Sequence, residues 1–205
     1  MNKCLVCDRV IEDNFNSIFK GYSCICYECL KKFKIRNDKF KMLGVKGIIL
    51  YYYDEFFKDI LYRYKGRYDY ALKDVFLGYN LQTLKRKFNG YSLVLAPSNE
   101  EAEMERGFCH LEAVFNALKL PIVKCFYKCE EWKQSDKSIS EREKVQNVIK
   151  IDKSKLNGIK KVLIVDDVLT SGSTIKAMIS QIPSSIAKKV LVLSSNCRIK
   201  TNEIV

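Results

Sequence analysis

One run of the chain, at residues 162–174, constrains the fold more than any other. Four consecutive apolar residues lead directly into two carboxylates, Asp166 and Asp167, and then into the hydroxyl-rich segment VLTSGST. A short, uninterrupted apolar run is typical of a strand buried on both faces of a parallel sheet. We expect this strand to end at the carboxylates and a helix to begin after the loop, at the carboxyl edge of the sheet, where open α/β folds bind ligands.

The segments around this run alternate between strand and helix patterns. Strands are predicted at 92–96, 122–127 and 189–194, and helices at 100–118 and 173–180. Apolar side chains at helical spacing in residues 54–77 predict two further helices joined by a turn near Gly66. The sequence therefore predicts an α/β fold with a mainly parallel sheet and helices on both faces.

Hydroxyl side chains and one glycine form the loop that follows the carboxylates. Backbone N–H groups and the helix dipole attract an anion there, and Gly172 allows its close approach. Asp166 and Asp167 can bind ribose hydroxyls directly or through Mg²⁺. The complete run predicts a ribose-5-phosphate site, whereas an isolated Asp-Asp would be interpreted as a helix cap. The residues predicted to bind the phosphate are Val168, Leu169, Thr170, Ser171, Gly172, Ser173 and Thr174.

Two Cys-x-x-Cys pairs lie near the start of the chain, Cys4 with Cys7 and Cys26 with Cys29. Their separation is typical of zinc ribbons, in which two knuckles supply four thiolates to a closed, tetrahedral Zn²⁺ site. We predict structural zinc in preference to redox-active thiols or a chance pattern. Cys24 could replace Cys26 as a ligand, but only Cys26 completes the second pair.

The chain of 205 residues suits one ordinary domain with a small appendage. We expect a zinc-binding module at 1–33 and a second domain at 34–205, in which 34–90 is helical, basic and aromatic and 91–205 forms the α/β core. No apolar stretch approaches the roughly 20 residues of a membrane span. Residues 1–10 lack the apolar region of a secretory signal, which predicts a cytoplasmic protein. A peripheral place at the inner membrane, held by partners, is the alternative.

Positive charge is unevenly distributed along a chain whose formal net charge is +12. Basic side chains concentrate in three stretches, 31–41, 58–67 and 85–87. Such clusters attract nucleic acid or a polyanionic metabolite, or they form only a solvated surface. Tyrosines alternate with cations around the second stretch, which suits binding of single strands unless the tyrosines belong to the core. The candidate nucleic-acid residues are Arg63, Lys65, Arg67, Tyr64 and Tyr68.

With these motifs in place, the chain resembles the ComF family over nearly its whole length. This family comprises competence-associated, phosphoribosyltransferase-like proteins with an N-terminal zinc-binding segment. The cysteine pairs match the family's own, residues 162–174 match its phosphoribosyl pyrophosphate motif, and residues 106–108 match its Arg-Gly-Phe element. The resemblance implies a type I phosphoribosyltransferase-like fold and a catalytic role for Asp166 and Asp167, which would hold Mg²⁺ together with phosphoribosyl pyrophosphate. It further implies that Pro97, Ser98 and Arg106 contact the pyrophosphate.

Two elements differ from the family pattern. Cys109 and His110 stand where the family usually has Asn-Gln, and residues 96–98 read Ala-Pro-Ser in place of a Pro-Val-Pro-like sequence. Both differences concern the pyrophosphate side of the site. Residues 128–147 resemble the family's flexible segment, which is either a lid over the site or an ordinary linker.

The resemblance implies a protein of bacterial natural competence that binds phosphoribosyl pyrophosphate and assists the uptake or processing of single-stranded DNA. The alternative is an active phosphoribosyltransferase of nucleotide or base salvage, whose acceptor the sequence does not define. His110 is the only histidine, and a lone histidine is more often structural or at the surface than a general base. A third possibility is a scaffold that docks a DNA-uptake helicase or another competence protein through residues 1–33.

Overall fold

A six-stranded sheet of order β1-β2-β8-β7-β3-β4 forms the centre of the computed structural model, which describes residues 2–11, 24–128 and 149–196. The strands are β1 (Ile35–Met42), β2 (Val45–Tyr52), β3 (Ser92–Leu95), β4 (Ile122–Val123), β7 (Lys161–Leu169) and β8 (Ala187–Ser195). All neighbouring pairs in this sheet are parallel except β1 with β2. The predicted mainly parallel sheet is confirmed.

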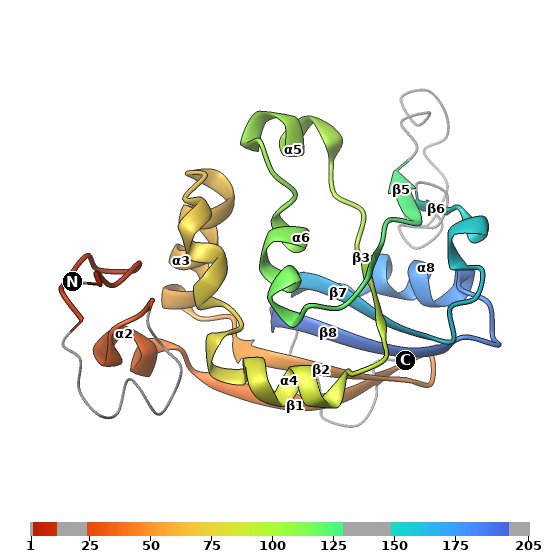
Figure 1. Cartoon of the computed structure of the whole chain (residues 1–205), viewed down its shortest axis with the longest axis horizontal. Coiled ribbons are helices and arrows are strands. Elements are labelled where there is room, and N and C mark those ends of the chain that lie inside the picture. Colours follow the sequence, from red (N-terminus) through yellow and green to blue (C-terminus); the bar gives the residue numbers. More distant parts are fainter. Residues whose placement is uncertain (1, 12–23, 129–148, 197–205) are drawn as a thin grey trace.

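Helices cover both faces of this sheet, as predicted. The α-helices are α2 (Tyr27–Lys32), α3 (Glu55–Gly66), α4 (Leu81–Lys87), α5 (Glu100–Arg106), α6 (His110–Phe115) and α8 (Ser173–Gln181). Short 3-10 helices are η1 (Tyr70–Val75), η2 (Gly78–Asn80), η3 (Asn116–Leu118) and η4 (Lys153–Leu156). In Figure 1, α4 and α6 lie in front of the sheet and α8 lies behind it. Right-handed crossovers explain this, because the β2-to-β3 and β7-to-β8 connections cross the sheet in opposite directions.

An antiparallel hairpin, β1 and β2, occupies part of the segment predicted to be helical, so that prediction is wrong for residues 35–52. Its two-residue turn places Leu43 at φ 47° and Gly44 at φ 77°. Positive φ at both positions is the geometry that matches the twist of a tight hairpin. β2 pairs in parallel with β8, beginning at Gly47↔Val190, and so connects the hairpin to the parallel strands.

Two further predicted elements are wrong because each is divided. The expected helix at 100–118 ends at Gly107, whose φ of 78° is left-handed, and α6 starts afresh at His110. A glycine in this conformation is a common helix C-cap. The expected strand at 122–127 separates into β4 and β5 (Phe126–Lys128), and β5 pairs with β6 (Ile149–Ile151) in a separate two-stranded sheet.

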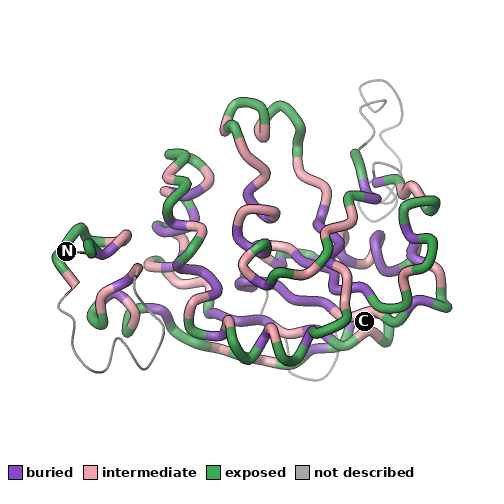
Figure 2. The backbone as a smooth tube through the Cα atoms, in the orientation of Figure 1, coloured by how far each residue is buried: buried purple, intermediate pink, exposed green. Residues whose placement is uncertain are grey.

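The buried apolar side chains form one continuous cluster that includes Cys4 and Cys29 as well as the strands. Figure 2 shows the buried positions following the central strands and the inward sides of the helices. The Phe33 ring lies 5.2 Å from that of Tyr51, which packs the chain after α2 against the end of β2. Among the described residues, no helix is long and apolar enough to cross a membrane.

Candidate functional site

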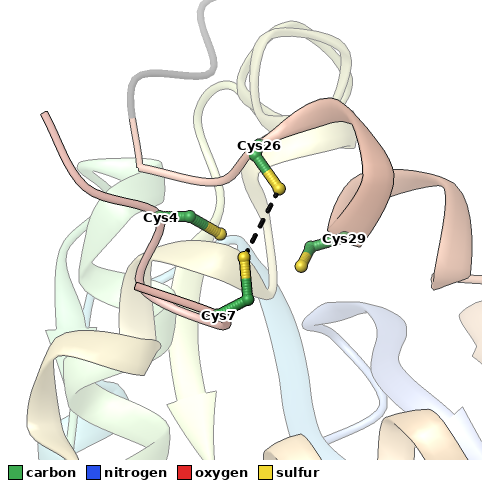
Figure 3. A group of neighbouring side chains, drawn as sticks. All are labelled: Cys4, Cys7, Cys26 and Cys29. Atoms are coloured by element: carbon green, nitrogen blue, oxygen red, sulfur yellow. Dashed lines mark hydrogen bonds between the residues drawn. The ribbon is translucent and has the colours of Figure 1, made fainter. Parts of the chain in front are cut away.

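Four cysteine sulfurs converge beside α2. The Sγ atoms of Cys4, Cys7, Cys26 and Cys29 all lie within 4.8 Å of one another and point toward a common centre (Figure 3). The Cys7 and Cys26 sulfurs are 3.7 Å apart. Four sulfurs bound to one Zn²⁺ at about 2.3 Å would be about 3.8 Å apart, so the cluster can hold a metal ion of this kind.

Local backbone structure places these thiols. Cys4 and Cys7 lie on a tight turn in which the Asp8 N–H donates to the Cys4 carbonyl at 2.9 Å. Cys26 precedes the first residue of α2, and Cys29 lies within that helix. The Cys24 thiol instead donates to the Asp74 carbonyl at 3.8 Å, outside the cluster. The structure therefore groups the four cysteines that the Cys-x-x-Cys spacing predicts, without Cys24.

The four thiols lie close enough together to affect one another's ionisation. Burial and the neighbouring Cys7 and Cys26 thiols raise the pKa of Cys29, because each thiolate in this space would repel the next. A bound divalent cation would remove that repulsion and would stabilise all four thiolates. The donor set thus fits a closed metal site with a structural role.

The second candidate site lies toward the carboxyl end of β7. This strand extends to Leu169, so Asp166 and Asp167 lie within it and the prediction that it ends at the carboxylates is wrong. The reason is that Val168 and Leu169 continue the pairing with Ser194 and Ser195 of β8. On the other side, β3 stops at Leu95 opposite Val165, which leaves that edge of β7 open beside the carboxylates.

The connections that follow the neighbouring strands β3 and β7 lead to opposite sides of the sheet. After β3 the chain moves outward to β4, whereas after β7 it moves the other way to β8. Neighbouring strands whose connections diverge leave a crevice outside their carboxyl ends, where open α/β sheets bind ligands. Asp166 and Asp167 therefore lie at the switch point of the sheet.

Two cationic or hydrogen-bonding side chains meet at Asp167, which is only 8% exposed. Lys65 Nζ lies 2.5 Å from its Oδ2 atom, and His110 Nε2 lies 3.2 Å from the same oxygen. The other carboxylate oxygen accepts the Val168 N–H at 2.7 Å. Burial alone would raise the pKa of Asp167, but the His110 hydrogen bond and the Lys65 charge hold it below its usual value. Asp167 is therefore anionic at neutral pH.

His110 connects this carboxylate to Arg106. Arg106 Nη1 lies 3.1 Å from His110 Nδ1, and a guanidinium can only donate, so Nδ1 accepts and Nε2 carries the proton that faces Asp167. Burial lowers the pKa of His110, which favours this neutral form. The Tyr64 hydroxyl donates to the His110 carbonyl at 2.8 Å and holds the start of α6. Arg106 Nε is buried and has no hydrogen-bond partner among the described residues.

Asp166 has a different environment from its neighbour. Its Oδ1 atom accepts the Asp167 N–H at 2.9 Å. Burial and the adjacent Asp167 charge raise the pKa of Asp166 above its usual value. The two carboxylates and the single Lys65 ammonium carry a net negative charge when both acids are ionised, so the pair fits a further cation such as Mg²⁺, which prefers carboxylate oxygens.

The hydroxyl-rich loop joins this strand directly to α8. Gly172 has a φ of 74° at the position before Ser173, where the helix begins. The Ser171 and Ser173 hydroxyls lie 2.8 Å apart, and Ser171 is exposed to solvent. The left-handed φ of Gly172 accounts for glycine there, and a side chain at this position would also meet Met42 Cε at 2.6 Å. The structure therefore brings residues 170–174 of the predicted phosphate-binding set together at one helix start, whereas Val168 and Leu169 belong to β7 and Leu169 is buried.

The predicted pyrophosphate contacts lie beside the same crevice. The Ala96 N–H donates to the Val165 carbonyl at 3.0 Å, which places Pro97 and Ser98 next to the β7 carboxylates. The Ser98 hydroxyl donates to Glu103, whose helix begins after the Asn99 cap. Among the described residues, Arg106 is linked to the carboxylates through His110. Residues 129–148, which include nearly all of the segment interpreted as a lid or linker, lie outside the described residues.

The five candidate nucleic-acid residues do not form one surface. Tyr64 is buried in the core, at 1% exposure. Arg63 donates to the Val6 carbonyl at 2.8 Å and supports the first cysteine turn, and Lys65 pairs with Asp167. Only Arg67 and Tyr68 are exposed. The contacts of Lys65 and His110 with Asp167 were not predicted, since no local pattern links residues so far apart in the chain.

Comparison with known proteins agrees with the motifs. No protein-family model matches the chain. It is 27% identical to competence protein ComFC of Streptococcus pneumoniae (strain ATCC BAA-255 / R6) over an alignment of 218 positions, which covers 94% of this chain and 98% of that protein. The predicted resemblance to the ComF family is thereby confirmed.

Solved structures with a related arrangement include phosphoribosyltransferases. An adenine phosphoribosyltransferase shares 14% sequence identity at a TM-score of 0.43, and the match covers 82% of this chain and 89% of that one. The orotate phosphoribosyltransferase of Aeropyrum pernix shares 15% identity at a TM-score of 0.36, with 82% and 92% of the two chains covered.

Proposed function

We propose that this chain binds phosphoribosyl pyrophosphate at the end of β7 and acts in natural competence. The observation that carries the proposal is the direct succession of the carboxylate pair Asp166–Asp167, the hydroxyl-rich loop and the start of α8 at the switch point of the sheet. The role in competence is supported by the similarity to competence protein ComFC.

Each part of the site suits one part of this ligand. Anionic Asp167 and its neighbour Asp166 accept hydrogen bonds from ribose hydroxyls, and the loop at residues 170–174 holds the 5-phosphate with N–H and hydroxyl groups. Bound Mg²⁺ would supply positive charge that links the carboxylates to the pyrophosphate oxygens. Arg106, which contacts His110 beside Asp167, places a guanidinium charge next to this site. Zn²⁺ at the four cysteines would hold the N-terminal turns together without taking part in chemistry.

Thermal unfolding tests the proposal in its simplest form. A ligand present at 100 times its Kd stabilises the folded state by about 2.7 kcal/mol. For a chain of this size we expect phosphoribosyl pyrophosphate with Mg²⁺ to raise Tm by about 5–10 °C. Ribose without phosphate groups should have no effect at the same concentration. An equal shift with ATP would mean that the site recognises polyphosphate rather than the phosphoribosyl group.

Lys65 gives a sharper test, because its ammonium already occupies one side of Asp167. This internal cation should support ligand binding when no metal is present. We expect Lys65→Met to weaken phosphoribosyl pyrophosphate binding about tenfold in EDTA, with recovery on addition of excess Mg²⁺.

The matched control for this prediction is Lys58→Met on the same helix, where the lysine pairs with Glu55. That variant should bind as the unchanged protein does in both buffers. Equal affinities of the Lys65→Met and unchanged proteins in EDTA would show that Lys65 contributes no charge to the ligand site.

A further inference from the structure

A pocket of about 570 Å³ lies between α4 and the strands β1, β2 and β8. Five lysines line it, namely Lys39, Lys41, Lys46, Lys87 and Lys189. Its size falls within the range of natural ligand sites. We call this feature the lysine pocket.

The lysine pocket is displaced from the carboxylate pair by about three residues, or roughly 10 Å, along the strands. Lys189 pairs with Leu163, near the start of β7, whereas Asp166 pairs with Val192. Gly47, beside Lys46, is likewise level with Val190. The pocket therefore lies toward the amino ends of the parallel strands and shares no residue with the proposed phosphoribosyl site.

None of the five pocket lysines has an acidic partner within 4.0 Å in the described part of the chain. Burial, followed by the charges of Lys39 and Lys189, lowers the pKa of Lys87. Like charges held this close repel one another, and a bound anion would relieve the repulsion. Elsewhere on the surface, lysines such as Lys58 and Lys124 do pair with glutamates.

The positive charge continues beyond the lysine pocket along the sheet. Lys189 Nζ lies 5.2 Å from the centre of the Tyr91 ring, and Lys161 Nζ lies 5.9 Å from the same ring. The lysines thus follow a line across β1, β2, β8 and β7. Four neighbouring strands span about 15 Å at about 4.8 Å per step, which is more than one phosphate group occupies. A row of cations of this length suits an extended polyanion.

Two of the three basic stretches of the sequence meet here. Residues 31–41 contribute Lys39 and Lys41, and residues 85–87 contribute Lys87. The third stretch, at 58–67, instead directs Arg63 and Lys65 toward carbonyl and carboxylate groups of the protein itself. The free positive charge is therefore concentrated at the lysine pocket rather than around α3.

We infer that the lysine pocket and Lys161 bind the phosphodiester backbone of a single nucleic-acid strand. Lysine side chains around an apolar floor contact phosphates without reading sequence, so this binding tolerates any sequence. The inference rests on the proposed competence function for the identity of the strand, but its site is separate from the phosphoribosyl site.

The test compares two triple variants of the full chain by fluorescence anisotropy with a labelled single-stranded oligonucleotide. Lys39→Gln, Lys87→Gln and Lys189→Gln together remove three pocket charges. We expect affinity to fall about tenfold or more at low salt, and the slope of log affinity against log salt to decrease by about 2, since each single-strand phosphate contact contributes about 0.7.

The matched control carries the same loss of charge elsewhere. Lys119, Lys150 and Lys153 are exposed and lie outside the pocket lining, and their joint change to Gln should leave affinity within about twofold. Equal losses in both triple variants would overturn the inference, because net charge alone would then explain binding. Three other results would also overturn the inference. The double variant Arg67→Gln with Tyr68→Ala could lose binding, a duplex could bind with equal affinity, or the unchanged protein could fail to bind the strand at low salt.

A parallel titration with phosphoribosyl pyrophosphate separates this inference from the proposed function. The pocket triple variant should bind that ligand as the unchanged protein does, because the pocket contains none of the β7 or loop residues. If the unchanged protein binds the strand but no phosphoribosyl pyrophosphate, the lysine pocket stands and the phosphoribosyl proposal fails.

Discussion

Replacing both carboxylates, Asp166→Asn with Asp167→Asn, is expected to reduce phosphoribosyl pyrophosphate affinity about 100-fold or more. Hydrogen bonds to charged groups contribute about 1.5–3 kcal/mol each, and the double variant removes both acceptors and the preferred Mg²⁺ ligands. Asn keeps the size of the side chain, so the β7 backbone can remain in place. Isothermal titration calorimetry measures the loss directly.

A control with the same change of charge is available outside the site. Asp59 is exposed, and in the described part of the chain Asp74 forms an ion pair with the neighbouring Lys73. Their joint change to Asn should therefore leave affinity within about twofold. The unfolding temperatures of both double variants show whether the fold persists. Unchanged affinity after loss of both β7 carboxylates would remove them from the ligand site.

The second large effect concerns the four-cysteine cluster. Cys29→Ser should reduce bound zinc from about one ion per chain to nearly none, because Cys29 is buried and supplies one of the four sulfurs. We expect the free energy of unfolding to fall by about 3 kcal/mol or more. For a chain of this length that corresponds to about 6–12 °C in Tm.

Cys24→Ser is the matched control, since the Cys24 thiol faces the Asp74 carbonyl and not the cluster. Zinc content, measured by metal analysis of protein purified under reducing conditions, should stay at one ion in this variant. Zinc retained by Cys29→Ser and lost from Cys24→Ser would assign the ligands differently. No zinc in the unchanged protein would remove the metal site.

A functional site is best predicted from sequence where its residues lie close together in the chain. The cysteine pairs converge because each pair lies on a single turn, and the loop at residues 170–174 follows its strand without interruption. The parallel sheet could likewise be predicted, because each central strand carries its own apolar run. Such features depend on a few adjacent residues and on little else.

Non-local contacts explain what the sequence did not predict. Lys65 and Asp167 are separated by 102 positions, and only the docking of α3 near the end of β7 brings the ammonium to the carboxylate. The β1–β2 hairpin depends on left-handed geometry at Leu43, a residue that rarely adopts it. The break at Gly107 depends on the left-handed conformation of this one glycine, which the sequence pattern of residues 100–118 does not specify. In each case tertiary packing decided between local alternatives.

The lysine pocket likewise shows that the charge of a segment does not predict which of its side chains are available to bind a ligand. Residues 31–41, 58–67 and 85–87 are similarly basic in sequence, yet their side chains meet different partners in the fold. Arg63 and Lys65 of the second stretch contact carbonyl and carboxylate groups of the protein. Lys31, Lys34 and Arg36 of the first stretch pair with acidic side chains, whereas Lys39, Lys41 and Lys87 have no acidic partner among the described residues. Charge counts alone could not distinguish them, because the difference lies in which side chains meet an acidic or carbonyl partner.

Calorimetric titration of the unchanged protein with phosphoribosyl pyrophosphate, with and without Mg²⁺, tests the central claim most directly. We predict one binding site per chain, with affinity strengthened by Mg²⁺ and absent for ribose without phosphate groups. A pyrophosphate-release assay on the same samples then separates binding alone from turnover. A flat titration in both buffers, with protein that is folded and carries its zinc, would contradict the assignment of Asp166, Asp167 and the following loop to a phosphoribosyl ligand.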